Sequence, residues 1–69
     1  MLTKGIVKGI IANLVIVEVD GPVSQNEIAY IVLEDTKLMA EVIKVVGKSA
    51  YIQVFESTRG LTIDAEVEF

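Results

Sequence analysis

Apolar and polar residues alternate along most of the chain, in short runs that are separated by turn-forming residues. A period of two is typical of β-strands that bury one face, because successive side chains point to opposite sides of the sheet. The pattern predicts six strands: Lys4–Ile11, Leu14–Val19, Ile28–Leu33, Lys37–Val46, Ser49–Glu56 and Asp64–Phe69. Six short strands at this spacing predict an all-β fold, namely a small closed six-stranded antiparallel barrel that forms a single domain over residues 1–69. Closure is favoured because an open sheet so rich in Val and Ile would expose unpaired edges.

The segments between the predicted strands carry residues that suit turns and loops. Ala12-Asn13 and Glu34-Asp35-Thr36 are predicted to be turns, and Asp20-Gly21-Pro22 is a strong turn signal that precedes a loop over Val23–Glu27. Gly47-Lys48 is predicted to be a two-residue hairpin loop, with glycine at the first central position of a type II′ turn. No internal repeat is evident.

A helix is the alternative for Leu38–Val46, because Met, Ala, Glu and Lys are good helix formers. Three valines and an isoleucine, the lack of an N-cap box, and a glycine followed directly by another strand favour the strand. Glu41 and Lys44 interrupt the apolar pattern of this strand, and simple alternation places them on opposite faces. Both are expected at outward or strand-end positions, or facing a partner charge across a subunit boundary.

The strand predicted at Ser49–Glu56 carries the candidate binding residues. If Ala50 and its alternate neighbours point inward, Tyr51 and Phe55 point outward, where they could anchor a neighbouring protein; with the opposite register they belong to the core. Arg59 lies in the polar turn that follows, where either a local ion pair with Glu56 or a contact between subunits is expected. The predicted interface residues are Tyr51, Gln53, Phe55, Glu56 and Arg59.

Composition restricts the chemistry that this chain can perform. It has 69 residues, of which 52% are apolar, and a mean hydropathy of +0.58, which is too hydrophobic for a disordered chain. With no cysteine and no histidine, disulfides, thiolate metal sites, Ser-His-Asp catalysis and His-ligated zinc are excluded. Its carboxylates could pair for acid–base catalysis, but solvated strand faces and turns explain them better. No catalytic, cofactor-binding or metal-binding residue is predicted.

Charge and hydropathy bear on the partners. A net charge of −4 argues against nucleic acid, whose binding depends on neutralised phosphates. A stand-alone barrel that binds single-stranded nucleic acid, as OB-folds do, would also need exposed aromatics in a basic groove, and this chain has only two Tyr and two Phe. No apolar run approaches the ~20 residues of a membrane-spanning helix, so neither membrane insertion nor secretion is predicted.

The run Ile52-Gln53-Val54-Phe55-Glu56-Ser57-Thr58-Arg59-Gly60 resembles a signature of the N-terminal β-barrel in the head subunits of archaeal and vacuolar-type rotary ATPases. In that family the last long strand reads Ile-Gln-Val, an aromatic, Glu, any residue, Thr, any residue, Gly. Lys4-Gly5, Leu38–Ile43 and Gly47-Lys48 are similar to further family positions. Ala12-Asn13 departs from the usual Gly-Pro, and Ala40 stands at a usual Gly.

The resemblance implies a structural barrel of the catalytic A (alpha) subunit of a V-type (A-type) ATP synthase. Such barrels form part of a crown that holds the hexameric head together during ATP-coupled proton or sodium transport. The implied partners are the neighbouring A and B subunits, and the implied location is cytoplasmic, at the membrane periphery within the head. ATP and magnesium would bind the parent chain, an ATP-hydrolysing or ATP-synthesising enzyme, in a P-loop domain outside this sequence.

Two assignments rest on smaller features. The short segment before the first strand, and Glu41 after a small residue, resemble the A (alpha) subunit, whereas Phe55 and Glu68-Phe69 resemble the B type. We favour the alpha type, with the same domain of the non-catalytic B subunit as the alternative. Phe69 is an apolar residue at the end of a strand-like segment, so we favour an N-terminal fragment of a longer subunit over a complete small protein whose last strand closes the barrel.

Overall fold

The computed structural model describes residues 3–69, and each predicted strand is present in it. The strands are β1 (Lys4–Ile11), β2 (Leu14–Val19), β3 (Ile28–Val32), β4 (Lys37–Val46), β5 (Ser49–Val54) and β6 (Glu66–Glu68). The described residues contain no helix, so the helical alternative for Leu38–Val46 is wrong.

Three strands are shorter than predicted. β3 ends one residue early, because the Leu33 N–H donates to the Thr36 carbonyl (2.8 Å) and so belongs to the turn. β5 ends at Val54, since the chain bends at Phe55. β6 begins at Glu66 rather than Asp64, because Asp64 has a φ of 76°, which a regular strand does not allow.

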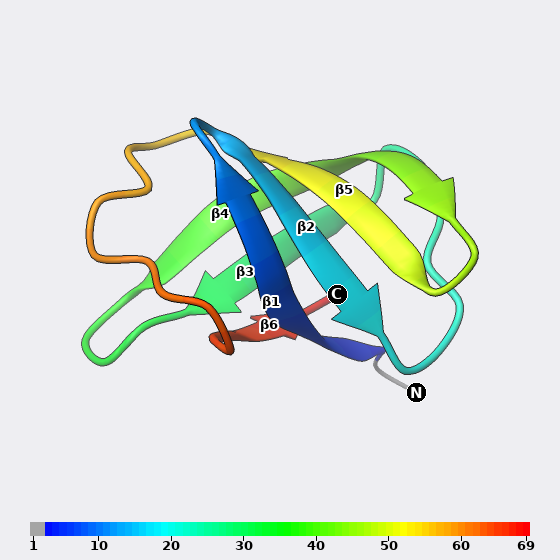
Figure 1. Cartoon of the computed structure of the whole chain (residues 1–69), viewed down its shortest axis with the longest axis horizontal. Coiled ribbons are helices and arrows are strands. Elements are labelled where there is room, and N and C mark those ends of the chain that lie inside the picture. Colours follow the sequence, from blue (N-terminus) through cyan, green and yellow to red (C-terminus); the bar gives the residue numbers. More distant parts are fainter. Residues whose placement is uncertain (1–2) are drawn as a thin grey trace.

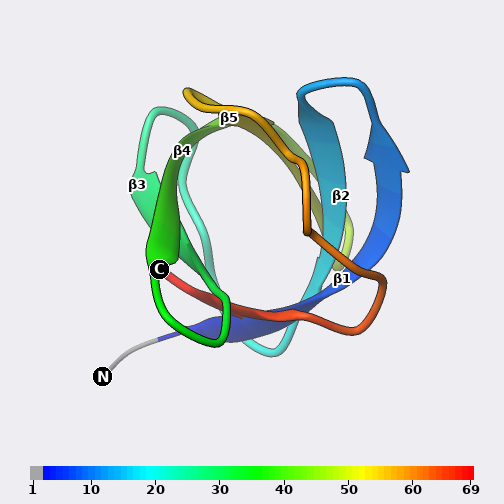
Figure 2. The ribbon, with the colours of Figure 1, turned by 90° about the vertical axis from the view of Figure 1, so that its left-hand side faces the viewer.

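The strands close into a barrel in the order β1-β2-β5-β4-β3-β6, and each neighbouring pair is antiparallel. Viewed from one side, they form a ring (Figure 2). β6 pairs with both β1 and β3 and so completes the closure that the sequence predicts. The long connection from β5 to β6 crosses one end of the barrel, between the β1–β2 turn and the β3–β4 turn (Figure 1).

Small and branched apolar side chains fill the barrel, as expected for the narrow interior of six strands. The buried hydrophobic core consists of Val7, Val15, Val17, Val19, Ala29, Ile31, Leu38, Ala40, Val42, Ala50, Ile52, Val54 and Val67. Space is so limited at Gly5 that a Cβ there would overlap the Val17 side chain and lie 2.9 Å from the Glu18 carbonyl oxygen. Glycine is therefore required where β1 passes β2.

A β-bulge in β4 changes which way its charged residues face. The pairing with β5 shifts between Val42 and Lys44, so Ile43 is an extra residue. Lys44 consequently lies opposite Tyr51 on the outer surface, and Glu41 lies opposite Gln53 on the same surface. The prediction that Glu41 and Lys44 occupy opposite faces is wrong, because the bulge resets the alternation.

The barrel has two similar halves, β1–β2–β3 and β4–β5–β6, although the sequence shows no repeat. β1 carries a bulge between Val7 and Gly9, at the position that corresponds to the β4 bulge. Both hairpins have a two-residue turn whose first residue has positive φ, 54° at Ala12 and 59° at Gly47. Lys48 keeps a negative φ, as the predicted type II′ turn requires.

The connections before β3 and β6 dock on these bulges in the same way. The Asn26 N–H donates to the Val42 carbonyl (2.7 Å), and the Val42 N–H donates to Glu27 (2.8 Å). Equivalently, the Asp64 N–H donates to the Val7 carbonyl (2.8 Å), and the Val7 N–H donates to the residue after Asp64 (2.9 Å). Asn26 and Asp64 both have positive φ. The two halves are thus related by an internal two-fold axis that exchanges β1 with β4, β2 with β5 and β3 with β6.

Candidate functional site

The aromatic residue of β5, Tyr51, lies on the outer surface of the barrel, where another protein can contact it. Ala50, Ile52 and Val54 are at most 1% exposed, which confirms the inward register for these three residues. Tyr51 and Gln53 therefore point outward, and Phe55 follows just beyond the strand.

Tyr51 is half-buried against its own barrel. Its register partners are Ile16 on β2 and Lys44 on β4. The Lys44 ammonium lies 5.7 Å from the centre of the Tyr51 ring, within the range of a cation–π interaction. Tyr51 is therefore less available to a partner than the sequence indicated.

Phe55 is the most accessible of the predicted aromatic residues, with 55% of its surface exposed. Its backbone N–H donates to the Met39 carbonyl (3.1 Å), which places Phe55 beside β4. Met39 pairs in turn with Tyr30 on β3, and Ile28 lies on the same side of β3. We call these four residues, Ile28, Tyr30, Met39 and Phe55, the apolar face.

Three residues of the apolar face were not predicted, because their places beside Phe55 depend on the register and topology of the sheet. Tyr30, Met39 and Ile28 are 39%, 40% and 41% exposed. The one signal in the sequence is that large apolar residues occupy outward positions of β3 and β4, where polar residues are usual. Exposed apolar residues that adjoin one another mark sites of interaction more often than scattered ones do.

The β1–β2 turn holds the chain just after β5 in place. The Asn13 side-chain amide donates to the carbonyls of Val54 (3.2 Å) and Glu56 (3.4 Å). The Asn13 carbonyl accepts from the Val54 N–H (2.9 Å), and the Thr58 hydroxyl donates to the Ala12 carbonyl (3.1 Å). These bonds flank Phe55 and fix the backbone that carries it, so the signature residue Thr58 has a structural role.

Glu56 and Arg59 are exposed on the connection that follows β5. The Arg59 N–H donates to the Ser57 hydroxyl (3.1 Å), but among residues 3–69 no ion pair joins Arg59 to Glu56 within 4.0 Å. The local ion pair is therefore not formed. Of the five predicted interface residues, only Glu56 adjoins Phe55 directly, whereas Tyr51 and Gln53 lie further along β5.

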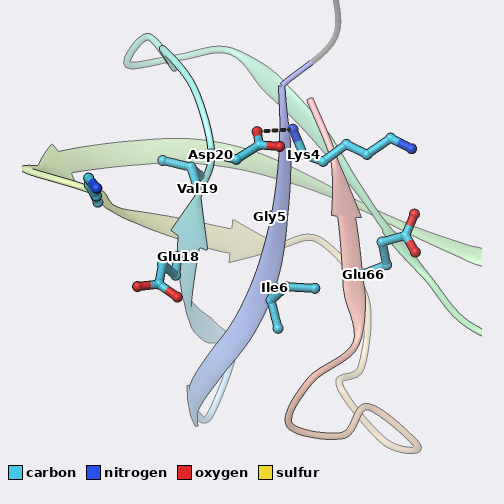
Figure 3. A pocket seen from close by; sticks show the side chains of 8 residues that line it. Lys4, Gly5, Ile6, Glu18, Val19, Asp20 and Glu66 are labelled. Carbon is cyan, nitrogen blue, oxygen red and sulfur yellow. Dashed lines mark hydrogen bonds between the residues drawn. The ribbon is translucent and has the colours of Figure 1, made fainter.

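A second outer surface carries charges instead. We call Lys4, Asp20, Glu66 and Glu68 the charged face. The Lys4 N–H donates to the Asp20 carboxylate (2.9 Å), and the Lys37 ammonium lies 3.0 Å from the Glu68 carboxylate. Lys4, Asp20 and Glu66 line part of a shallow hollow of about 500 Å³ over β1 (Figure 3). Across residues 3–69 no three acidic residues are grouped as a metal site would require.

A family model for the beta-barrel domain of the ATP synthase alpha/beta family matches residues 7–69. The chain belongs to this family. Three relatives are V-type ATP synthase alpha chains. That of Treponema pallidum (alpha chain 1) is 46% identical over 97% of this chain, that of Chlamydia trachomatis serovar D is 49% identical over 97%, and that of Borrelia garinii subsp. bavariensis is 46% identical over 100%.

These relatives confirm the alpha type, which the short segment before the first strand and Glu41 after a small residue favoured. The match also agrees with the fold, since the family model describes a β-barrel and the structure is one. The chain spans only 11–12% of the length of these relatives. A helix long and apolar enough to cross a membrane is absent from residues 3–69.

Proposed function

We propose that this barrel is an assembly domain of the alpha subunit in a V-type ATP synthase and that it holds the subunits of the head together. The observation that carries the proposal is the combination of family membership with Phe55, a 55% exposed aromatic that the barrel fixes on its outer wall. Aromatic residues held in this way are typical anchors of protein–protein contacts.

The closed sheet suits a structural role. Every strand is paired on both sides, and the interior is packed with side chains that are at most 7% exposed. Such a barrel resists shear, because deformation would break ladder hydrogen bonds and disturb a close-packed core. A ring of these barrels would keep the subunits together while other domains open and close around nucleotide.

The remaining parts of the proposal concern the parent chain. We infer that it is a longer subunit in which ATP and magnesium bind outside this barrel, and that it supports ATP-coupled transport of protons or sodium. Its partners would be the neighbouring A and B subunits, with no nucleic acid and no direct membrane insertion. It would lie in the cytoplasm, attached to the membrane through the rest of the enzyme.

The proposal is tested by deleting the barrel from the full-length subunit. We expect the shortened subunit to bind ATP but to fail to form a stable hexamer with its B partner, as measured by native mass spectrometry. A full-length subunit with the exposed substitution Thr62→Ala provides the control and should assemble normally. Normal hexamer formation by the barrel-deleted subunit would refute the assembly role.

A further inference from the structure

The two halves of the barrel, β1–β2–β3 and β4–β5–β6, are interlocked. Four strand pairings join strands of different halves, namely β1 with β6, β2 with β5, β3 with β4 and β3 with β6. Among residues 3–69, β3 and β6 pair with no strand of their own half. The third strand of each half is therefore held in place entirely by the other half.

The core is shared between the halves in the same way. Where β2 pairs with β5, buried Val15 lies opposite Ile52 and buried Val17 lies opposite Ala50. Each half alone would be one hairpin with a bare apolar face and an unpaired third strand, and an isolated hairpin is at best marginally stable in water. A half of this barrel is therefore stable only against a complementary half.

A short link connects the two halves covalently. Val32 at the end of β3 lies opposite Lys37 at the start of β4, and the Leu33 N–H donates to the Thr36 carbonyl (2.8 Å) in the turn between them. A link this short gives the attached halves an effective concentration on the order of 1 mM. At lower protein concentrations the halves of one chain therefore pair with each other, although the strand pairings themselves do not require the link.

We propose that a second copy of this chain can supply the complementary half, so that two chains exchange halves and form a dimer of two complete barrels. In this dimer β1–β2–β3 of one chain pairs with β4–β5–β6 of its partner, and only the link changes conformation. Such an exchange costs little, because the strand pairings and the core of the monomer are retained. The surface involved is the inner face of each half, so the inference goes beyond the proposed function and does not depend on it.

The test shortens the link so that a single chain cannot close the barrel. With residues 34–36 deleted, only Leu33 separates β3 from β4, whereas the tightest common hairpin needs two residues. β3 and β4 can then continue as one strand, in which Ile31, Leu33 and Leu38 still alternate and face the core. We expect a dimer in native mass spectrometry, with the β-sheet circular dichroism of the wild type. A folded monomer would overturn the inference.

A matched control keeps the length of the link and removes its side chains. The triple substitution Glu34→Gly, Asp35→Gly and Thr36→Gly retains every backbone group of the turn, including the carbonyl that accepts from the Leu33 N–H. We expect this variant to be a monomer at micromolar concentration, like the wild type, because its halves remain attached by a link that can close the hairpin. A dimer of the control would mean that the length of the link does not decide which half is bound, and this result would contradict the inference.

A disulfide distinguishes exchanged halves from two intact barrels that associate. Tyr30 on β3 lies opposite Met39 on β4, and the chain contains no cysteine. Tyr30→Cys with Met39→Cys therefore places two thiols within reach of a disulfide, which oxidised glutathione forms by taking up their two electrons and two protons. In the shortened variant the disulfide should join two chains, so that a denaturing gel without reductant shows a covalent dimer. Disulfides confined to single chains in that variant would rule out the exchange.

A second measurement keeps the link intact and does not depend on the folding of the shortened variant. The chain with Tyr30→Cys and Met39→Cys is unfolded in urea with reductant, refolded at concentrations from about 0.01 to about 1 mM, and then oxidised. The share of covalent dimer should rise at least about fivefold over this range, because a second copy competes with the attached half near the effective concentration. A share of dimer that does not change with concentration would refute the exchange of halves.

Discussion

Replacing Ala12 by glycine should stabilise the barrel, because Ala12 has a φ of 54° in the β1–β2 turn. In the left-handed region a Cβ approaches the following carbonyl oxygen, which costs about 1–2 kcal/mol in any residue other than glycine. Glycine removes this cost but loses more conformational entropy on folding, by roughly 0.5–1 kcal/mol. The expected net gain from Ala12→Gly is therefore about 0.5–1 kcal/mol.

The second hairpin offers a matched experiment in the opposite direction. Gly47 has a φ of 59° at the equivalent turn position, and a Cβ there would meet no atom within 4 Å. Any effect of Gly47→Ala must therefore come from the backbone and not from crowding. We expect this substitution to destabilise the barrel by about 0.5–1 kcal/mol.

Thermal and urea unfolding, followed by circular dichroism on the 69-residue chain, measure both variants. A change of 1 kcal/mol moves the Tm of a domain of this size by roughly 4–8 °C, so the two Tm values should lie on opposite sides of the wild-type value. Ala12→Gly combined with Gly47→Ala should nearly cancel, since the turns are separate. A lower Tm for Ala12→Gly, or shifts of equal sign in the two variants, would show that the turns are not strained by positive φ.

Further substitutions test the core, the close approach and the turn contacts. Gly5→Ala should lower the free energy of unfolding by about 1–3 kcal/mol, because its Cβ would overlap Val17; a Tm equal to wild type would contradict the close approach. Ile52→Ala should lower the free energy of unfolding, measured in urea, by about 2–5 kcal/mol. Ile63→Ala, at a position 49% exposed, should lower it by less than about 0.5 kcal/mol. Similar losses in both variants would mean that the barrel is not closed around Ile52. Asn13→Ala should cost about 1–2 kcal/mol and increase amide exchange at Val54–Thr58, and unchanged exchange there would refute the clamp on the segment after β5.

The alternation of the sequence was sufficient to predict the closed barrel and the bounds of β1, β2 and β4. These strands end at residues with their own turn preference, such as Gly47. The end of β5 was not predictable, because Phe55 fits a strand by residue type and leaves it only for tertiary reasons. The start of β6 was predicted too early, because the alternation of Asp64–Phe69 was weighted above the low strand preference of Asp. Asp64 takes positive φ so that its N–H can reach the Val7 carbonyl (2.8 Å).

The bulge at Ile43 was not predictable from the sequence either. Ile43 and Val42 are consecutive apolar residues between Glu41 and Lys44, and simple alternation accounts for them as residues on opposite faces without an extra residue. The internal symmetry was not predictable from the sequence, because the two halves share a backbone arrangement and not their residue types. When the first hairpin, residues 4–19, is aligned with the second, residues 39–54, the only identical pairs are Val7 with Val42 and Val19 with Val54.

The candidate site was predicted in part. The outward orientation of Phe55 followed from alternation once Ala50, Ile52 and Val54 were taken as core. Its neighbour Met39 could not be found, because the bulge shifts the register of β4 against β5 by one residue, and Tyr30 is reached only through the further pairing of β3 with β4. Partial burial of Tyr51 was equally hidden, since Lys44 faces outward only because of the bulge.

The two halves of the barrel show which positions the fold constrains and which it leaves free. Inward positions keep the same chemistry in both halves, as Val17 and Ile52 do at 0% exposure, because both must fill one shared interior. Outward positions have no such requirement, and there Asp20 in one half corresponds to Phe55 in the other. A difference between equivalent outward positions cannot be attributed to folding, since one backbone arrangement supports both residues. The apolar character of the apolar face therefore does not follow from the fold, because the equivalent outward positions of the other half carry charged residues.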